Sequence, residues 1–162
     1  KTNNIKFKNI FEIGTNNGVN LNAIKSLNKD IKTFGLELNK NAFDIARKNH
    51  KVYNESALNF KSDKKYDLVL TSCVLIHINP KQLKKIYDLI YKLSKKYILI
   101  NEYHNPTPVS VNYRGYKNVL FKRNFAGEIM KKYNFKLVDY GFCWKDDKKH
   151  YFEDTNWFLF KK

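Results

Sequence analysis

Two carboxylates beside a glycine-bearing turn are the first residues whose types and spacing could do chemistry. Glu12 stands inside the apolar stretch KNIFEIG (8–14), and Gly14 and Gly18 bracket the small polar residues that follow. Glycines let the backbone adopt positive φ and approach a ligand closely. Because a buried carboxylate needs a compensating charge or hydrogen bonds, Glu12 either faces a cationic ligand or accepts hydrogen bonds from backbone amides of the turn.

Glu37 is the second acid, and it stands near the end of another apolar stretch, 31–38. Nucleotide-binding folds place an acid about 20 residues past the glycine turn, where it accepts hydrogen bonds from ribose hydroxyls. The alternative is a solvated glutamate at a strand end. A dinucleotide is disfavoured because Asn16 and Val19 occupy two glycine positions of the G-x-G-x-x-G pattern. A nucleoside that carries a cation, such as S-adenosylmethionine, would suit both acids.

A second group of polar residues follows later apolar stretches and could act on an acceptor molecule. His77, Tyr103 and His104 are candidate catalytic residues, although either histidine could instead simply pack against its neighbours. Arg114 suits a carboxylate or a phosphate through its planar fork, or else forms a surface salt bridge. Glu102 and Tyr113 are the other candidate substrate-binding residues. No cluster has metal-ligand spacing, so we expect no metal.

Alternating strands and helices must position these residues. The patterns predict strands over 8–14, 31–38, 51–58, 66–72, 96–103, 135–144 and 156–162, and helices over 19–27, 40–49, 80–94 and 123–133. The expected helix caps are Asn39, Asn79 and Asn124. The long segment 104–122 is expected to be a loop. In helix 19–27, the apolar residues Val19, Leu21, Ile24 and Leu27 recur at helical spacing.

This order predicts an α/β fold, a Rossmann-like three-layer sandwich with helices on both faces of the sheet. The sheet is expected to have seven strands, mostly parallel, with an antiparallel last strand. We expect one domain over residues 1–162, which is enough chain for a hydrophobic core.

Composition restricts the partners. Hydrophobic residues make up 43% of the chain and the net charge is +16, yet the only arginines are Arg47, Arg114 and Arg123. Proteins that read base edges or bind phosphates in a bidentate manner favour arginine over lysine. With so few arginines, a nucleic-acid partner is disfavoured. No apolar run approaches the roughly 20 residues that span a bilayer. Cys73 and Cys143 are not spaced for a metal or a redox pair, which favours reduced thiols in a cytoplasmic protein.

The chain resembles the class I S-adenosylmethionine-dependent methyltransferases, over nearly its whole length. FEIGTNNG resembles the first motif of that family, with Asn16 in place of the middle glycine. A narrower resemblance, to methylases associated with pseudaminic acid biosynthesis, is carried by DLVLTSCVLIHINP, EYHNPTPV and LFKRNFAGE. It implies methyl transfer from S-adenosylmethionine to a small molecule, a surface-polysaccharide or nonulosonic-acid sugar. The alternatives are an RNA or protein methyltransferase that uses the basic surface, and a non-catalytic module.

The resemblance also implies roles for individual residues. The methionine part of the cofactor would lie against Gly14, Thr15, Asn16 and Gly18, with Asn20 on its carboxylate and the carbonyls of Ser72 and Cys73 on its amino group. Glu37 would hold the ribose, and Leu38, Ser56 and Ala57 would contact the adenine. An enclosed acceptor pocket would be lined by Tyr103, His104, Tyr113 and Arg114. The resemblance leaves the oligomeric state open.

Overall fold

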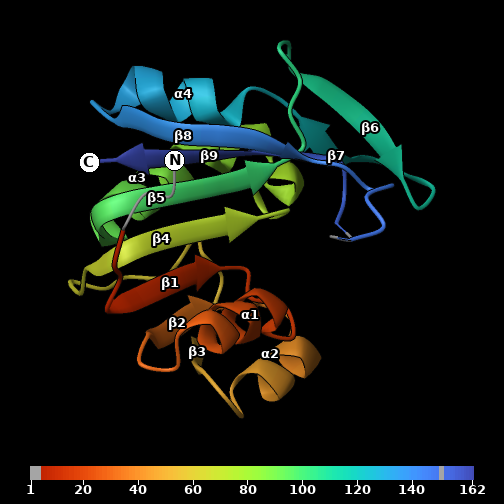
Figure 1. The fold of residues 1–162 in the computed structure, drawn as a ribbon. Helices are drawn as coiled ribbons and strands as arrows, with labels where there is room; N and C mark the ends of the chain where they lie inside the picture. The colour runs from red at the N-terminus through yellow and green to blue at the C-terminus, as the bar shows by residue number, and fades with distance from the viewer. Residues whose placement is uncertain (1–4, 150–151) are drawn as a thin grey trace.

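The computed structural model describes residues 5–149 and 152–162, which form a twisted seven-stranded sheet between two layers of helices (Figure 1). The sheet order is β3-β2-β1-β4-β5-β9-β8. Its strands are β1 (Asn9–Ile13), β2 (Lys32–Leu36), β3 (Lys51–Tyr53), β4 (Tyr66–Ser72), β5 (Ser94–Glu102), β8 (Lys136–Cys143) and β9 (Thr155–Lys161). The first five strands run parallel, and β9 is antiparallel to both β5 and β8. The predicted sheet, with its reversed last strand, is confirmed.

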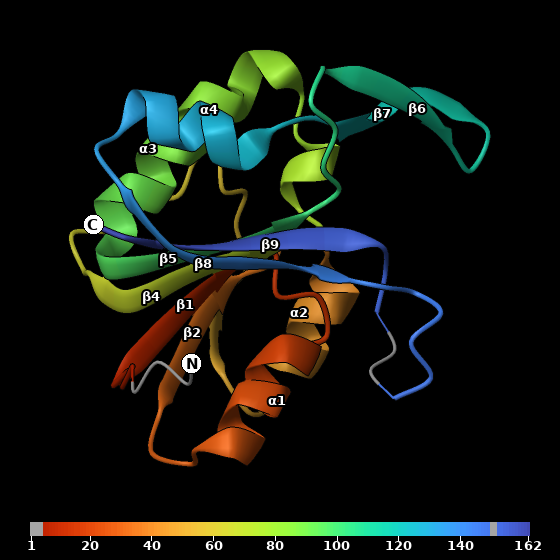
Figure 2. The same ribbon diagram turned by 45° about the horizontal axis from the view of Figure 1, so that its top comes forward.

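The helices lie on both faces of the sheet. Helices α1 (Val19–Leu27) and α2 (Lys40–Ala46) cover one face near β1 to β3, and α3 (Leu83–Leu93) and α4 (Phe125–Lys132) cover the other (Figure 2). Two short 3₁₀ helices, η1 (Leu75–His77) and η2 (Pro80–Gln82), lie between β4 and α3. Among the described residues, no helix is both long and apolar enough to cross a bilayer.

The main core fills the space between the sheet and α3 and α4. The leucines and isoleucines of α3 are all buried: Leu83, Ile86, Leu89, Ile90 and Leu93. On the other face, α1 forms over the residues that the helical spacing predicted, but only part of its apolar set is buried. Leu21 is buried, but Val19 is 67% exposed and Leu27 is 88% exposed. The reason is that α1 covers only the β1 side of that face, so a helix with a broad apolar stripe has too little sheet beneath it.

The segment 104–122 is the main departure from the predicted elements. It contains a two-stranded antiparallel sheet, β6 (Val109–Tyr113) and β7 (Tyr116–Lys122), that projects from the body of the molecule (Figure 1). Arg114 and Gly115 form the turn, with φ of 50° and 84°. Two-residue hairpin turns need positive φ and favour Asn-Gly or Asp-Gly, so the Arg-Gly pair here gave no clear turn signal.

Candidate functional site

The carboxyl ends of β1, β2 and β4 meet at a cavity of about 860 Å³. In open α/β sheets, ligands bind at this edge, beyond the strand ends. Most of the residues that the sequence assigns to a cofactor line this one cavity: Gly14, Asn16, Glu37, Leu38, Ser56, Ala57, Ser72 and Cys73. They come from four separate chain segments, so the fold brings them together as the sequence predicted.

The turn after β1 is held close to its neighbours on two sides. The backbone N–H groups of Gly14 and Thr15 both donate to the carbonyl of Leu36 at 2.9 Å, which ties the turn to β2. Gly14 and Asn16 have φ of 74° and 47°. A Cβ on Gly14 would lie only 2.4 Å from a methyl carbon of Val74. Gly14 therefore satisfies both a positive φ and a close approach of the loop that follows β4.

Glu37 lines the cavity and binds the backbone on both sides of it. One carboxylate oxygen accepts the N–H of Asn16 at 2.7 Å, and the other accepts the N–H of Asn39 at 2.7 Å. A carboxylate oxygen has two lone-pair sites, so each keeps capacity for a ligand hydroxyl. Next to it, Leu38 is 70% exposed although it lines the cavity. The carboxylate of Glu37 can accept hydrogen bonds from ribose hydroxyls, and the exposed side chain of Leu38 next to it can pack against a planar base.

The loop after β4 forms the opposite wall, and a buried acid supports it. Glu102 accepts the N–H groups of Val74 and Ile76 at 3.2 and 3.4 Å and is only 2% exposed. Burial raises its pKa to about 7, against the lowering effect of these hydrogen bonds. Glu102 is therefore a support of the cavity wall, which corrects its prediction as a substrate-binding residue.

In the same loop Cys73 has φ of 54°, and burial raises the pKa of its thiol to about 12, so the thiol stays protonated.

Glu12 also differs from its predicted position. It is fully buried and lies outside the lining of the cavity, and Nδ2 of Asn20 donates to one of its carboxylate oxygens at 2.7 Å. The other oxygen has no hydrogen-bond partner among the described residues. Burial, opposed by the Asn20 hydrogen bond, raises the pKa of Glu12 to about 7. Glu12 and Asn20 therefore bind each other, and neither lines this cavity.

Two further residues that were predicted to bind the cofactor support the turn from outside the cavity. Thr15 is 2% exposed, and its side chain packs against Gly35 of β2. Gly18, with φ of 81°, is the N-cap of α1, and a Cβ there would lie 2.9 Å from the ring of His50. Both residues therefore fix the turn without lining the cavity.

The predicted acceptor pocket is not formed by its expected residues. None of Tyr103, His104, Tyr113 and Arg114 lines the cavity. The candidate catalytic residue His77 does, and its Nδ1–H donates to the carbonyl of Val119 at 3.0 Å. Tyr103 donates to Glu153 at 3.1 Å, and the ring of His104 lies 6.3 Å from that of Phe158. Tyr113 lies beside His77, with ring centroids 5.6 Å apart, and Arg114 is exposed at the hairpin tip. The hairpin of β6 and β7 therefore leaves Tyr113 near His77 but carries Arg114 to its exposed tip.

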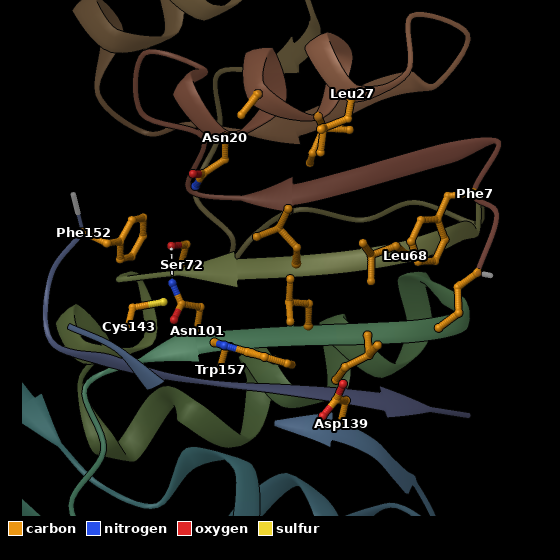
Figure 3. A pocket seen from close by; sticks show the side chains of 16 residues that line it. Phe7, Asn20, Leu27, Leu68, Ser72, Asn101, Asp139, Cys143, Phe152 and Trp157 are labelled. Atoms are coloured by element: carbon orange, nitrogen blue, oxygen red, sulfur yellow. Dashed lines mark hydrogen bonds between the residues drawn. The ribbon is translucent and has the colours of Figure 1, made fainter. Parts of the chain in front are cut away.

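Sequence reasoning missed a second cavity, of about 600 Å³, on the α1 face of the sheet (Figure 3). We call it the open-face groove. Its walls are apolar side chains of β4, β5 and β9, with α1 along one side, and one end is polar: Asn20, Ser72 and Asn101. Ser72 lines both cavities. The signal that could have revealed it is the asparagine at position 101, which directly follows the apolar run 97–100 in β5.

Among the residues the structure describes, no group of three or more histidine, cysteine or acidic side chains could hold a metal ion.

The fold is that of S-adenosylmethionine-dependent methyltransferases. The chain matches the N-methyltransferase NodS from Bradyrhizobium japonicum with a TM-score of 0.73 and 16% identity, covering 96% of this chain and 86% of that one. It matches an O-methyltransferase from a polyketide synthase of Brevibacillus brevis, in complex with S-adenosyl-L-homocysteine, with a TM-score of 0.74 and 13% identity over 97% and 67% of the two chains.

A third similar structure is the magnesium protoporphyrin IX methyltransferase of Synechocystis with bound S-adenosylmethionine, at a TM-score of 0.69 and 12% identity over 94% and 69% of the two chains. Comparison with protein-family models and with curated protein sequences gave no match. The relation is therefore one of fold, and the acceptors of these enzymes differ among themselves.

Proposed function

We propose that this protein is a methyltransferase that uses S-adenosylmethionine to methylate a small molecule in the cytoplasm, with residues 1–162 acting as a single domain. The observation that carries the proposal is the cavity in which the glycine turn, Glu37 and the loop after β4 converge. The solved methyltransferases with the same fold, two of them with S-adenosylmethionine or its product bound, support it.

The cavity fits the donor. The carboxylate of Glu37 would accept the ribose hydroxyls, and Leu38 with Ala57 would enclose the adenine. The turn at Gly14 and the backbone of Ser72 and Cys73 would hold the methionine part. The donor supplies an activated methyl group on a sulfonium. The chain then needs only to orient donor and acceptor and to exclude water.

The proposed acceptor is a sugar of surface-polysaccharide or nonulosonic-acid type. This part rests on the resemblance of the segments 67–80, 102–109 and 120–128 to methylases associated with pseudaminic acid biosynthesis. Arg114, the residue expected to bind an acidic sugar, lies on an exposed hairpin tip. Recognition of such a sugar therefore has to use residues nearer the cavity, among which His77 remains the candidate base.

Donor binding gives the first test. We expect Glu37→Ala to weaken the binding of S-adenosyl-L-homocysteine by at least about tenfold, because two charge-assisted hydrogen bonds to the ribose are lost. The measurement is isothermal titration calorimetry on purified protein. Arg114→Ala is the matched control, and it should bind as the parent does. Equal affinity in Glu37→Ala and the parent would show that the ribose lies elsewhere.

The acceptor is tested with labelled donor and a panel of nucleotide sugars, nonulosonic acids and RNA. The proposal expects label in a small-molecule product and no label in RNA. Incorporation into RNA alone would favour the alternative in which the +16 chain uses its basic surface. A protein that binds no donor would be a non-catalytic module.

A further inference from the structure

One edge of the main sheet is strongly basic, and it is the edge opposite the cavity proposed for the donor. In Figure 1 this edge lies on the left, where the arrows of β4, β5 and β8 begin and where β9 ends at the C-terminus. Exposed lysines stand at each of these strand ends, and we call the set the basic edge. It comprises Lys64 and Lys65 before β4, Lys95 and Lys96 in β5, Lys136 in β8, and Lys161 and Lys162 at the end of β9.

The fold brings like charges together at the basic edge. Lys136 and Lys161 stand directly opposite each other in the register of β8 and β9, and the carbonyl of Lys96 accepts the N–H of Lys162 at 2.8 Å. Like charges in directly opposite positions destabilise an antiparallel pair. Burial and the nearby charge of Lys65 lower the pKa of Lys162. The edge therefore carries an electrostatic cost that an anionic partner would reduce.

The acids beside the basic edge are too few to neutralise it. Asp63 pairs with Lys92, a lysine outside the set, at 3.3 Å, and Asp67 accepts a backbone N–H at 2.8 Å. Asp139 lies further along β8. The segments that the structure does not describe contribute no acid, since their sequences are KTNN and HY. The basic edge therefore keeps a net positive charge.

The length of the sheet separates the basic edge from the cavity. β5 begins at the basic edge and ends with Glu102 behind the cavity wall, so its nine residues span roughly 25–30 Å. At the cavity edge the charged residues include acids, Glu37 and Glu55. A polyanion bound along the basic edge would therefore not place a reacting group next to the donor. The basic edge suits attachment of the whole protein to a surface, rather than recognition of the methyl acceptor.

The side chains of the basic edge favour a diffuse anionic surface over a nucleic acid. All the arginines of the chain stand outside the set, and lysine is a point charge without the bidentate geometry of arginine. Tyr91, at the same edge, is 38% exposed. The ammonium of Lys162 lies 3.6 Å from the centroid of its ring, and the ring of Tyr133 stacks on it with centroids 4.4 Å apart. Tyrosine and lysine side chains together are typical of the boundary between lipid headgroups and water.

A second copy of this chain is a poor partner for the same surface. In a two-fold symmetric dimer one surface patch meets itself, so the lysines of one basic edge would face the lysines of the other. A bilayer that carries anionic lipids instead presents negative charge to every strand end at once.

We propose that the basic edge is a peripheral docking surface for a bilayer that contains anionic lipids, with the donor cavity turned away from the membrane. The lysines are attracted to the lipid phosphates, and Tyr91 lies at the level of the headgroups. The attraction extends over about one Debye length, so the binding is reversible and falls as salt rises. None of these lysines lines the donor cavity, so docking leaves donor binding unchanged.

The test is co-sedimentation of the full chain with vesicles of phosphatidylcholine, either pure or with about 30% phosphatidylglycerol. We expect binding to the anionic vesicles only, and at least about a tenfold loss of that binding when salt rises from about 0.1 M to about 0.5 M. The double variant Lys64→Glu with Lys65→Glu should bind the anionic vesicles at least about tenfold more weakly than the parent, because attraction becomes repulsion at one strand end.

The matched control makes the same change of charge elsewhere. Lys84→Glu with Lys85→Glu alters two exposed lysines in the first turn of α3, at the end of that helix away from the basic edge. It should bind the anionic vesicles within about threefold of the parent, because charges beyond a Debye length from the membrane contribute little. Circular dichroism and titration with S-adenosyl-L-homocysteine show that each variant is folded. If the first double variant does not fold, Lys95→Gln with Lys136→Gln replaces it, with an expected loss of about threefold or more.

Three results would overturn the proposal. Failure of the parent to bind anionic vesicles in preference to neutral ones would mean that the basic edge does not dock on lipid. Equal losses in the variants of the basic edge and of α3 would show that net charge, rather than this edge, determines binding. RNA that displaces the chain from the vesicles, and that binds the Lys64→Glu, Lys65→Glu variant more weakly than the parent, would assign the edge to a nucleic acid.

Discussion

At the scale of single residues, Gly14 shows how backbone conformation and packing combine at the site. Its φ of 74° favours glycine, and Val74 fills the space that a Cβ would need. Gly115 has a similar φ of 84°, but no atom lies within 4 Å of its Cβ position. A substitution at Gly115 therefore adds only backbone strain, whereas a substitution at Gly14 adds both backbone strain and a clash with Val74.

We expect Gly14→Ala to reduce the affinity for S-adenosyl-L-homocysteine by on the order of tenfold, because the loop at Val74 must move away from the turn. Gly115→Ala should leave that affinity unchanged and lower the free energy of unfolding by about 1–2 kcal/mol, the cost of the left-handed conformation. Calorimetric titration and denaturant unfolding of both variants supply the measurements. Similar donor affinities in the two variants would mean that contact with Val74 does not matter.

At the scale of elements, the starts of α2, η2 and α4 were readable because each depends on one local side chain. The predicted caps Asn39, Asn79 and Asn124 each accept a backbone N–H within their own turn, at 3.1, 3.0 and 2.8 Å. In α4 the cap and the helix are closely coupled, since a Cβ on Gly127 would lie 2.5 Å from the amide nitrogen of Asn124.

We expect Asn124→Ala to lower the free energy of unfolding by about 1 kcal/mol, as loss of an N-cap does. Gly127→Ala should disturb the same cap, so the double variant should be destabilised by less than the sum of the single effects. Urea unfolding of the parent, the two single variants and the double variant measures the coupling free energy between positions 124 and 127. Additive effects would show that the amide of Asn124 can move aside and still cap the helix.

At the scale of the whole molecule, buried acids make stability depend on pH. Burial raises the pKa of Glu12 from 4.5 to about 7. Between these two values the folded state holds a proton that the unfolded state has lost. The free energy of unfolding therefore falls as pH rises through this window.

We expect Glu12→Gln to remove that part of the pH dependence. The free energy of unfolding of the variant, relative to that of the parent, should rise by about 1–3 kcal/mol between pH 4.5 and 7.5, with most of the rise below pH 7. Denaturant unfolding across this range measures the difference, and Asp146→Asn, at an exposed position, is the control. A constant difference between Glu12→Gln and the parent at every pH would contradict the raised pKa.

The same scale explains why the predicted acceptor pocket is not formed by its expected residues. Arg114 lies at the exposed tip of the hairpin of β6 and β7, whereas Tyr113 lies beside His77, with ring centroids 5.6 Å apart. Asn101 lies within β5, and its Nδ2 reaches the hydroxyl of Ser72 because β4 and β5 pair side by side.

The sequence by itself determined the seven strands of the main sheet, the four α-helices, three helix caps, the mostly parallel arrangement of the sheet and the convergence of Gly14, Glu37 and Ser72 on one cavity. These features follow from periodicity, glycine and cap positions, and from the rule that parallel strands end at one edge. Only the tertiary structure decided that Glu12 and Glu102 are buried supports and that a second, apolar groove joins the first at Ser72. The reason is physical: burial and the direction of a side chain depend on which distant segment packs against it, and local sequence does not specify that partner.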